Sequence, residues 1–332
     1  MEQLKLALIG TGFWGQFQLA AWNEIAGVRV VALCDANRKR AEDTASRFRV
    51  PRAYENAEEM LRSESIDVVD IAASPASHER LVSLAAEHGL AVICQKPMAL
   101  EYTACERMVE VCRRAGVRFL IHENFRWQRP LRRVKQVLES GRIGRPIRAH
   151  IQFSHGPIEL FDNQPFLYTD PHFAMFDMGP HLLDLARFLF GEPSSVCARE
   201  FRAHPRFAGE DIVSASLGYD RFHCHCELSW RTTDYEVFVE GLLGTLTWRP
   251  KGEIAIESDT VVDKETVKPD SYRWADPRYG FSHPSIVTTN AHLLSALRGE
   301  CEAETTGEDN LKTMRLVDLA LRSAVVGQVL AV

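Results

Sequence analysis

Short apolar runs alternate with amphipathic segments through the first 122 residues of the chain. The runs are rich in aliphatic and β-branched residues and lie at residues 4–9, 28–34, 67–73, 91–94 and 117–121. Strands that are buried on both faces and alternate with helices are typical of a parallel sheet covered by helices. The pattern therefore predicts an α/β protein in which residues 1–122 form a doubly wound Rossmann domain.

The chain beyond residue 122 follows a different pattern. A helical segment over residues 130–141 leads into runs where apolar and polar residues alternate with period two. In the clearest run, residues 221–230, the alternate apolar positions are Phe222, Cys224, Cys226, Leu228 and Trp230. Further apolar runs lie at residues 212–219, 236–240 and 244–248. We therefore expect residues 123–332 to form an α+β domain with a large, mostly antiparallel open sheet.

The segment GTGFWG at residues 10–15 is a G-x-G-x-x-G motif. It follows a predicted strand and opens a predicted helix. Twenty residues after its last glycine, Asp35 stands at the end of the second predicted strand. In this context the glycines let the backbone approach a pyrophosphate, and Asp35 can accept hydrogen bonds from a ribose. The predicted cofactor residues of the loop are Gly10, Gly12, Phe13, Trp14 and Gly15.

Asp35 also bears on which nicotinamide cofactor binds. A carboxylate at this position hydrogen-bonds a 2′-hydroxyl but repels a 2′-phosphate. Arg38, together with Lys39 and Arg40, follows closely and could offset that repulsion. We therefore predict NAD, include Arg38 among the cofactor residues, and keep NADP as the alternative.

Two further loops follow predicted strands of the parallel sheet, at residues 72–79 and 94–100. Ligands of open α/β sheets bind outside the carboxyl ends of the strands, so polar residues in these loops are candidates for the nicotinamide end of the cofactor. Lys96, fixed by the proline that follows it and placed beside a hydride carrier, is also expected to be functional. The predicted cofactor residues here are Ser74, Pro75, His78, Gln95, Lys96 and, just beyond the last predicted strand, Asn124.

The apolar segment MFDMGPHLLD at residues 175–184 carries two titratable side chains four residues apart, Asp177 and His181. Pro180 is tolerated in a helix only near its start, so the helix is expected to begin around residues 176–179. Positions four apart share one helix face. Two interpretations follow: a solvent-facing stripe that continues to Asp184, or a catalytic pair in which His181 accepts a proton.

Composition restricts the partners. The formal net charge of −6 argues against nucleic acid and anionic membranes, which both need a basic surface. The apolar run at the N-terminus is too short for a signal peptide, and no stretch approaches the length of a membrane span. We expect a cytoplasmic protein with a small-molecule substrate.

The cysteines and paired histidines do not indicate a metal. Eight cysteines occur without a C-x-x-C spacing, which is typical of buried thiols in a reducing compartment. His223 and His225 lie on the polar face of a predicted strand, and no third ligand accompanies them in the sequence. We expect no metal.

Taken in order, these motifs resemble the Gfo/Idh/MocA family, named for glucose–fructose oxidoreductase, inositol dehydrogenase and a rhizopine-catabolism protein. The resemblance extends from GTGFWG through PASH (75–78), QKPMAL (95–100), NFRWQRP (124–130), GRIGRP (141–146) and DMGPHLLDLARFLFG (177–191) to TTGEDNLKTMRLVDLALRSA (305–324). It implies that Lys96 and His181 contact the reacting hydroxyl with Asp177 beside them, and that the open sheet pairs subunits into a homodimer or homotetramer. Gln95 departs from the family, which more often has glutamate there.

The combined prediction is an NAD-dependent oxidoreductase. It would transfer a hydride between the nicotinamide and a secondary alcohol of a sugar, inositol or related polyol, with Lys96, Asp177 and His181 as catalytic residues. Two alternatives are a sugar-responsive regulator that binds NAD without turnover and a glycosidase that uses bound NAD transiently. The predicted substrate-binding residues are Lys96, Arg126, His155, Tyr168, His172, Asp177 and His181.

Overall fold

The computed structural model describes residues 3–156, 158–230, 234–249 and 252–332. The chain divides into two compact units. The first unit comprises Met1–Trp127 and Ser271–Lys312, and the second comprises Gln128–Asp270 and Thr313–Val332. The sequence-based division into 1–122 and 123–332 therefore differs from this one, because residues 271–312 return to the first unit. The pattern of apolar and polar residues indicates which face of a helix or strand is buried. It does not indicate which of the two units that face packs against.

The first unit contains a six-stranded sheet in the order β3-β2-β1-β4-β5-β6, with all neighbours parallel. Its strands are β1 (Leu4–Ile9), β2 (Val28–Cys34), β3 (Arg52–Tyr54), β4 (Val68–Ile71), β5 (Ala91–Gln95) and β6 (Phe119–His122). The order in which strands are added to the sheet reverses between β1 and β4, and such sheets bind ligands at this point. This topology confirms the predicted doubly wound Rossmann domain.

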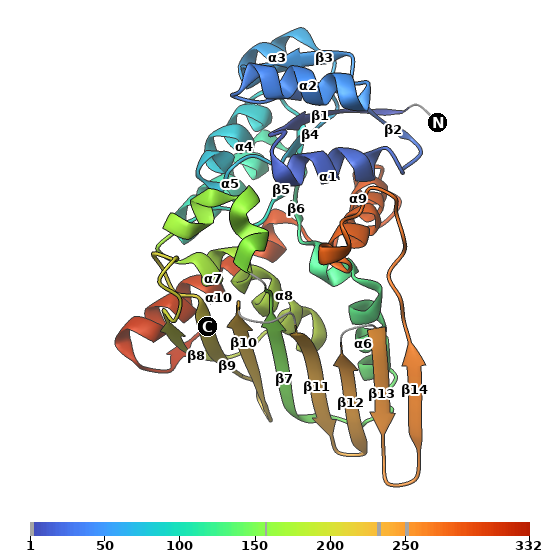
Figure 1. Cartoon of the computed structure of the whole chain (residues 1–332), viewed down its shortest axis with the longest axis vertical. Helices are drawn as coiled ribbons and strands as arrows, with labels where there is room; N and C mark the ends of the chain where they lie inside the picture. The colour runs from blue at the N-terminus through green and yellow to red at the C-terminus, as the bar shows by residue number, and fades with distance from the viewer. Residues whose placement is uncertain (1–2, 157, 231–233, 250–251) are drawn as a thin grey trace. The chain divides into compact units, whose positions relative to one another are not determined.

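The helices of the first unit include one that is distant in the sequence. They are α1 (Phe13–Trp22), α2 (Arg38–Phe48), α3 (Ala57–Ser63), α4 (His78–Glu87), α5 (Tyr102–Ala115) and α9 (Ser282–Leu297), with short 3₁₀ turns η1 (Pro75–Ser77), η2 (Asn124–Trp127) and η6 (Pro277–Tyr279). Leu293 and Leu294 of α9 belong to the same buried core as Leu6, Leu8 and Trp22. Helix α9 lies beside α1 (Figure 1) and completes that core, which is why residues 271–312 group with the Rossmann domain.

The second unit contains a nine-stranded sheet in the order β14-β13-β12-β11-β7-β10-β9-β8-β15 (Figure 1). Its strands are β7 (Pro146–Ser154), β8 (Ser195–Phe201), β9 (Ile212–Gly218), β10 (His223–Ser229), β11 (Asp234–Gly241), β12 (Gly244–Arg249), β13 (Glu253–Glu257), β14 (Val262–Thr266) and β15 (Leu330–Ala331). Strands β7 and β10 pair in parallel and the other neighbours are antiparallel. The predicted mostly antiparallel open sheet is confirmed.

One face of this sheet is buried. On β10, Cys224 and Cys226 are fully buried, whereas His223 and His225 are exposed, as the period-two alternation predicts. The helical part of the unit consists of α6 (Arg129–Glu139), α7 (Phe173–Asp177), α8 (Gly179–Phe190), the end of α10 (Gly307–Val326) and the 3₁₀ turns η3 (Ile158–Asn163) and η4 (Pro165–Thr169). Helix α8 packs on β7 and β10 and so carries the DMGPH segment into the core of the unit.

All eight cysteines are free thiols. Six of them are buried, as expected, but Cys301 is exposed, so the prediction of uniformly buried thiols was wrong at that position. Within the described residues, no helix combines the length and the apolar character needed to cross a bilayer.

A carboxyl group lies in the middle of the parallel sheet. Asp70 on β4 is fully buried, and its Oδ2 accepts a hydrogen bond from Trp22 Nε1 of α1 at 2.7 Å. Burial raises the pKa of Asp70 to about 7, and the hydrogen bond from Trp22 offsets only part of this effect. The carboxyl group is therefore held near the midpoint of its titration at neutral pH.

Replacing Asp70 with asparagine should reduce the pH dependence of stability. In the unfolded chain this group titrates near pH ~3.9, so the folded protein binds the extra proton and loses stability as pH rises from about 4 to about 7. In the wild type, the free energy of unfolding should fall by on the order of a few kcal/mol over this range because of Asp70. We expect this fall to be absent in Asp70→Asn, as measured by unfolding in urea. The variant Asp67→Asn, at an exposed carboxylate before β4, is the control and should keep the wild-type slope. If the free energy of unfolding of Asp70→Asn depended on pH as in the wild type, the raised pKa of Asp70 would be contradicted.

Candidate functional site

The glycine loop between β1 and α1 has the geometry of a dinucleotide cradle. Gly10 has φ of +97°, and a Cβ there would lie 2.5 Å from the backbone nitrogen of Ala73. A Cβ on Gly15 would lie 2.0 Å from the carbonyl oxygen of Gly10, so both positions require glycine. Beside Gly12, in contrast, no protein atom lies within 4 Å of an added Cβ. No side chain caps α1 at Gly12, which leaves an open approach to the first N–H groups of the helix.

Asp35 immediately follows β2 and is held in its anionic form. Its Oδ2 accepts hydrogen bonds from the backbone nitrogen and the hydroxyl of Thr11, both at 2.9 Å, and its Oδ1 accepts from Asn37 N at 2.8 Å. The Arg40 guanidinium bridges both oxygens at 2.9 and 2.6 Å. Burial alone would raise the pKa of Asp35, but the hydrogen bonds from Arg40, Asn37 and Thr11 outweigh it and lower the pKa.

The structure separates the roles of the basic residues after Asp35. Arg40 is the one that pairs with Asp35, and its side chain is about half exposed, so it remains accessible to a ligand. Arg38 instead pairs with Glu42 one helical turn along α2 at 2.9 Å. The predicted contact of Arg38 with the cofactor stays a prediction. Arg40 is a stronger candidate that the sequence did not single out.

The loops after β4 and β5 are joined through a buried histidine. His78 is fully buried, with Nδ1 at 3.1 Å from the carbonyl oxygens of Pro97 and Met98 and Nε2 at 3.1 Å from that of Ala73. Burial lowers the pKa of His78. His78 thus positions the backbone around Lys96, and its direct contact with a cofactor stays a prediction.

The remaining cofactor candidates lie around the same loops. Lys96 immediately follows β5, and both Lys96 and Gln95 are partly buried. Ser74 is exposed at the start of η1, and Pro75 is the first residue of that turn. Because β4 and β5 are neighbours in the parallel sheet, the residues that follow them share its carboxyl edge, as predicted.

Aromatic residues from η6 and α9 pack on the start of α1. Phe13 and Trp14 lie with their ring centroids 5.7 and 6.0 Å from that of Tyr279, and Trp14 lies 5.5 Å from His283. His283 is fully buried, and burial lowers its pKa to about 4, so the ring is neutral at physiological pH. Tyr279 and His283 could not be predicted from the sequence, because their proximity to the glycine loop depends on the return of residues 271–312 to the first unit.

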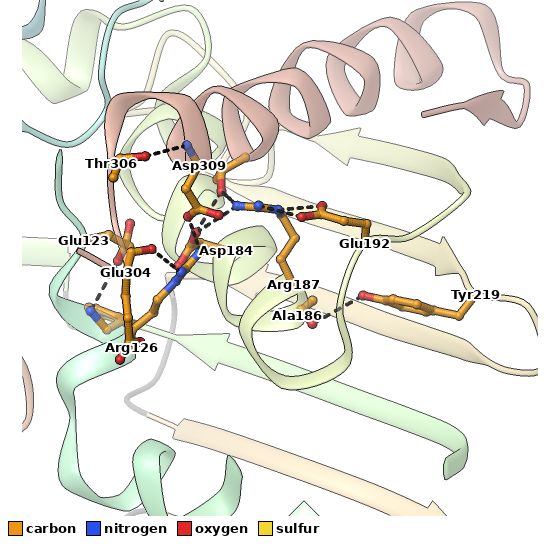
Figure 2. Close-up of polar contacts among 12 residues, drawn as sticks. Glu123, Arg126, Asp184, Ala186, Arg187, Glu192, Tyr219, Glu304, Thr306 and Asp309 are labelled. Carbon is orange, nitrogen blue, oxygen red and sulfur yellow. Dashed lines mark hydrogen bonds and ion pairs between the residues drawn. The ribbon is translucent and has the colours of Figure 1, made fainter. Parts of the chain in front are cut away.

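Asn124 and Arg126 hold η2 within the first unit. The Asn124 amide donates to Ser282 O at 3.0 Å and to Ser285 Oγ at 2.8 Å. Arg126 is buried and donates to Glu304 O at 2.8 Å and to Asp309 Oδ2 at 2.7 Å (Figure 2). These contacts explain why both side chains are buried, whereas their assigned roles in cofactor and substrate binding stay predictions.

Asp177 and His181 lie on consecutive turns of one helical path. Helix α7 ends at Asp177 and α8 begins at Gly179, within the predicted range, and Met178 between them keeps helical dihedral angles. Backbone hydrogen bonds from Met178 N to Ala174 O and from Leu182 N to Met178 O, both 3.0 Å, run across the junction. The four-residue spacing therefore places Asp177 and His181 on the same side.

Burial excludes the solvent-facing interpretation of this segment. His181 is 3% exposed and Asp184 only 1% exposed, so no wet stripe runs along α8. A buried polar side chain on a helix needs a partner or a function. The catalytic roles of Asp177 and His181 stay predictions.

A buried network fixes α8 in the second unit (Figure 2). Arg187 Nη1 donates to Thr313 Oγ1 at 2.6 Å, and that hydroxyl donates to Asp184 Oδ1 at 2.8 Å. The other side of the Arg187 guanidinium binds Glu192 at 2.9 and 2.8 Å. The network anchors the helix that carries His181. The spacing of Asp184 and Arg187, three residues apart, was the signal in the sequence that could have revealed it.

Three predicted substrate-binding residues of the second unit, His155, Tyr168 and His172, lie beside polar side chains of the same unit. His155 is hydrogen-bonded through Nδ1 to the Tyr235 hydroxyl. The Tyr168 hydroxyl donates to Asp162 Oδ1 at 2.7 Å. Burial is the main cause and this bond the second cause that raise the pKa of Tyr168 to about 12. His172 precedes α7 and lies with Nδ1 3.6 Å from a carboxylate oxygen of Glu210. Their contacts with substrate stay predictions.

Comparison with known proteins gives matches along the whole chain. A model of the Gfo/Idh/MocA family, described as an oxidoreductase family with an NAD-binding Rossmann fold, matches residues 4–123. A second model, described as the Gfo/Idh/MocA C-terminal domain, matches residues 131–247.

Two relatives match over nearly their full length. D-apiose dehydrogenase of Paraburkholderia graminis is 36% identical, with 99% of this chain and 89% of that protein covered. D-apiose dehydrogenase of Rhizobium rhizogenes is 33% identical over 99% and 97% of the two chains. A solved oxidoreductase from Agrobacterium radiobacter, in complex with NAD+, L-tartaric acid and magnesium, superposes with a TM-score of 0.95 at 33% identity and covers 99% and 98% of the chains.

Two glycine substitutions should separate folding from cofactor binding. Alanine at Gly12 meets no protein atom within 4 Å, so Gly12→Ala should fold normally but obstruct the approach of a pyrophosphate, weakening NADH binding by about tenfold or more. Gly15→Ala places a methyl group against the Gly10 carbonyl and should lower the melting temperature. Fluorescence titration with NADH and thermal melting measure the two effects. Wild-type affinity in a folded Gly12→Ala protein would place the pyrophosphate elsewhere.

Proposed function

The chain belongs to the Gfo/Idh/MocA family of NAD-binding oxidoreductases, and from this membership we propose that it is a sugar dehydrogenase that oxidises an aldose such as D-apiose with NAD. The observation that carries the substrate class is the 36% identity to a D-apiose dehydrogenase over 99% of the chain. The cradle beside Gly12 and the anionic Asp35 support NAD as the cofactor.

The reaction fits the secondary alcohol that the sequence analysis predicts. In the ring form of an aldose, the anomeric carbon carries a hydrogen and a hydroxyl group and so reacts as a secondary alcohol. Loss of a hydride from carbon and of a proton from oxygen converts this centre into the carbonyl of a lactone. NAD, when bound, supplies the hydride acceptor. The protein has to orient the sugar, receive the proton and stabilise charge on the oxygen.

Three side chains are proposed to carry these tasks. His181 accepts the hydroxyl proton through an imidazole nitrogen, the role of a general base. Asp177, on the same side of the helical path, orients His181 and stabilises its protonated form. The Lys96 ammonium stabilises negative charge developing on the substrate oxygen. The buried position of His181 and the His78 tether beneath the Lys96 loop support these assignments.

We further propose that the protein works as a homodimer or homotetramer in the cytoplasm. The polar face of the nine-stranded sheet offers a broad surface for pairing, on which His150 and His225 lie with ring centroids 5.8 Å apart beside Glu227. Eight unpaired thiols fit a reducing compartment. Light scattering of the purified protein tests the assembly.

A substrate panel tests the function. We expect NADH to accumulate with D-apiose or a related aldose, with kcat/KM at least about tenfold higher than for myo-inositol, a difference of about 1.4 kcal/mol in transition-state binding. The assay follows NADH absorbance with sugars, cyclitols and sugar acids. Sugar binding without NADH formation would identify a regulator instead. Cleavage of a glycoside without net NADH would identify a glycosidase.

Removing either proposed catalytic group should abolish turnover while preserving the cofactor site. Lys96→Met and His181→Asn should each lower kcat by about a hundredfold or more, because each removes an interaction made with the reacting oxygen or its proton. NADH affinity should stay within a few-fold of wild type. Lys264→Met, at an exposed lysine on β14, is the matched control and should keep full activity. A Lys96→Met or His181→Asn protein that retains most activity would remove that residue from the mechanism.

A further inference from the structure

Three side chains that can bind metals, one histidine and two glutamates, meet in the second unit, outside the proposed catalytic groups. His172 precedes α7, Glu200 lies on β8 and Glu210 lies just before β9. One ligand atom from each residue lies within 4.8 Å of the others, and His172 Nδ1 is 3.6 Å from Glu210 Oε2. Two atoms on opposite sides of one ion at ordinary bond lengths are about 4.2 Å apart. The three atoms are thus close to the spacing of a metal site.

These atoms are buried and lack hydrogen-bond partners. The Glu210 side chain is 3% exposed. Among the described residues, Glu210 Oε2, Glu200 Oε2 and His172 Nδ1 have no hydrogen-bond partner and almost no contact with solvent. Burying two carboxylates side by side without compensation costs several kcal/mol per ion. Either a cation or a proton must offset this cost.

The backbone aims Glu210 at the cluster. Its Oε1 accepts a hydrogen bond from Met175 N at 3.0 Å, and its carbonyl oxygen accepts from Ala174 N at 3.2 Å. These bonds fix the carboxylate against α7 and leave Oε2 directed at His172 and Glu200. His172 is itself held through its backbone nitrogen, which donates to Asp170 Oδ1 at 2.9 Å. Ligands oriented by such outer contacts are typical of metal sites.

The local electrostatics favour a cation. Glu200 and Glu210 bring two carboxylates to the site, and the Asp170 carboxylate lies nearby, bonded to the backbone nitrogen of His172. A divalent ion would pair with both buried carboxylates.

We propose that His172, Glu200 and Glu210 bind one divalent transition-metal cation, Zn²⁺ or Mn²⁺. One imidazole nitrogen and two carboxylate oxygens form a mixed donor set suited to these ions, whereas Mg²⁺ prefers oxygen ligands alone. Three protein ligands leave at least one position for water. The sequence spacing of 28 and 10 residues between them does not match a metal motif.

The role of this ion would be structural. It would tie the residue that opens α7 to β8 and to the segment entering β9. Helix α7 is only five residues long and ends at Asp177, so fixing its start restricts the position of Asp177. The metal site itself does not depend on the proposed dehydrogenase activity. Only its effect on Asp177 rests on that proposed function.

Metal binding by the full-length protein tests the site directly. Chelator-treated protein is titrated with Zn²⁺, Mn²⁺ and Mg²⁺ by calorimetry, and its melting temperature is recorded with each ion. We expect one equivalent of Zn²⁺ or Mn²⁺ to bind and to raise the melting temperature, and Mg²⁺ to bind at least about tenfold more weakly.

Two glutamate variants decide whether the ion occupies this site. Glu210→Gln should lose the bound equivalent and the stabilisation by metal. It should nevertheless fold, because glutamine is neutral and can keep the contact with Met175 N. Glu227→Gln is the matched control, since Glu227 lies beside His150 and His225 at 3.2 and 3.3 Å on the partly exposed sheet face, and it should bind metal like wild type. Absence of binding to the wild type, or stoichiometric binding that survives in Glu210→Gln, would overturn the proposal.

Discussion

The need to compensate buried charges determines how the residues around the candidate site are held. An ion removed from water costs several kcal/mol unless a partner or several hydrogen bonds compensate it. Asp35 is compensated by Arg40, and Arg126 by Asp309, each through short charge-assisted bonds. Arg187 satisfies the same requirement inside the second unit. Because the charges occur at the ends of elements, compensating them also fixes the loops and helices that present the candidate site.

The parts of the fold that rest on local patterns were predictable from the sequence. Strands buried on both faces, a glycine loop between strand and helix, and an alternating strand at residues 221–230 all depend on near neighbours in the chain. The start of α8 was predictable for the same reason, since Pro180 restricts where a helix can begin. β3 was missed because three residues carry too little pattern.

The parts that depend on contacts between distant segments were not predictable in this way. The packing of Tyr279 near Phe13 and Trp14 requires a return of the chain over more than 260 residues. The cluster around Glu210 draws on three separate elements whose spacing has no period. Side chain types alone indicated candidates such as Arg126, but only the fold reveals that its guanidinium is already engaged by Glu304 and Asp309.

The discontinuity of the first unit has a consequence for biosynthesis. Its core includes Leu293 and Leu294, which the ribosome adds long after Trp127, the last residue of the unit's first segment. The separation from residue 127 to residue 297, the end of α9, is 170 residues, or roughly 9–34 s of translation at ~5–20 residues per second. During that interval the nascent Rossmann sheet exposes the apolar face that α9 later covers. The first unit therefore completes its core only after most of the second unit has been synthesised, so the protein cannot mature strictly in the order in which it is made.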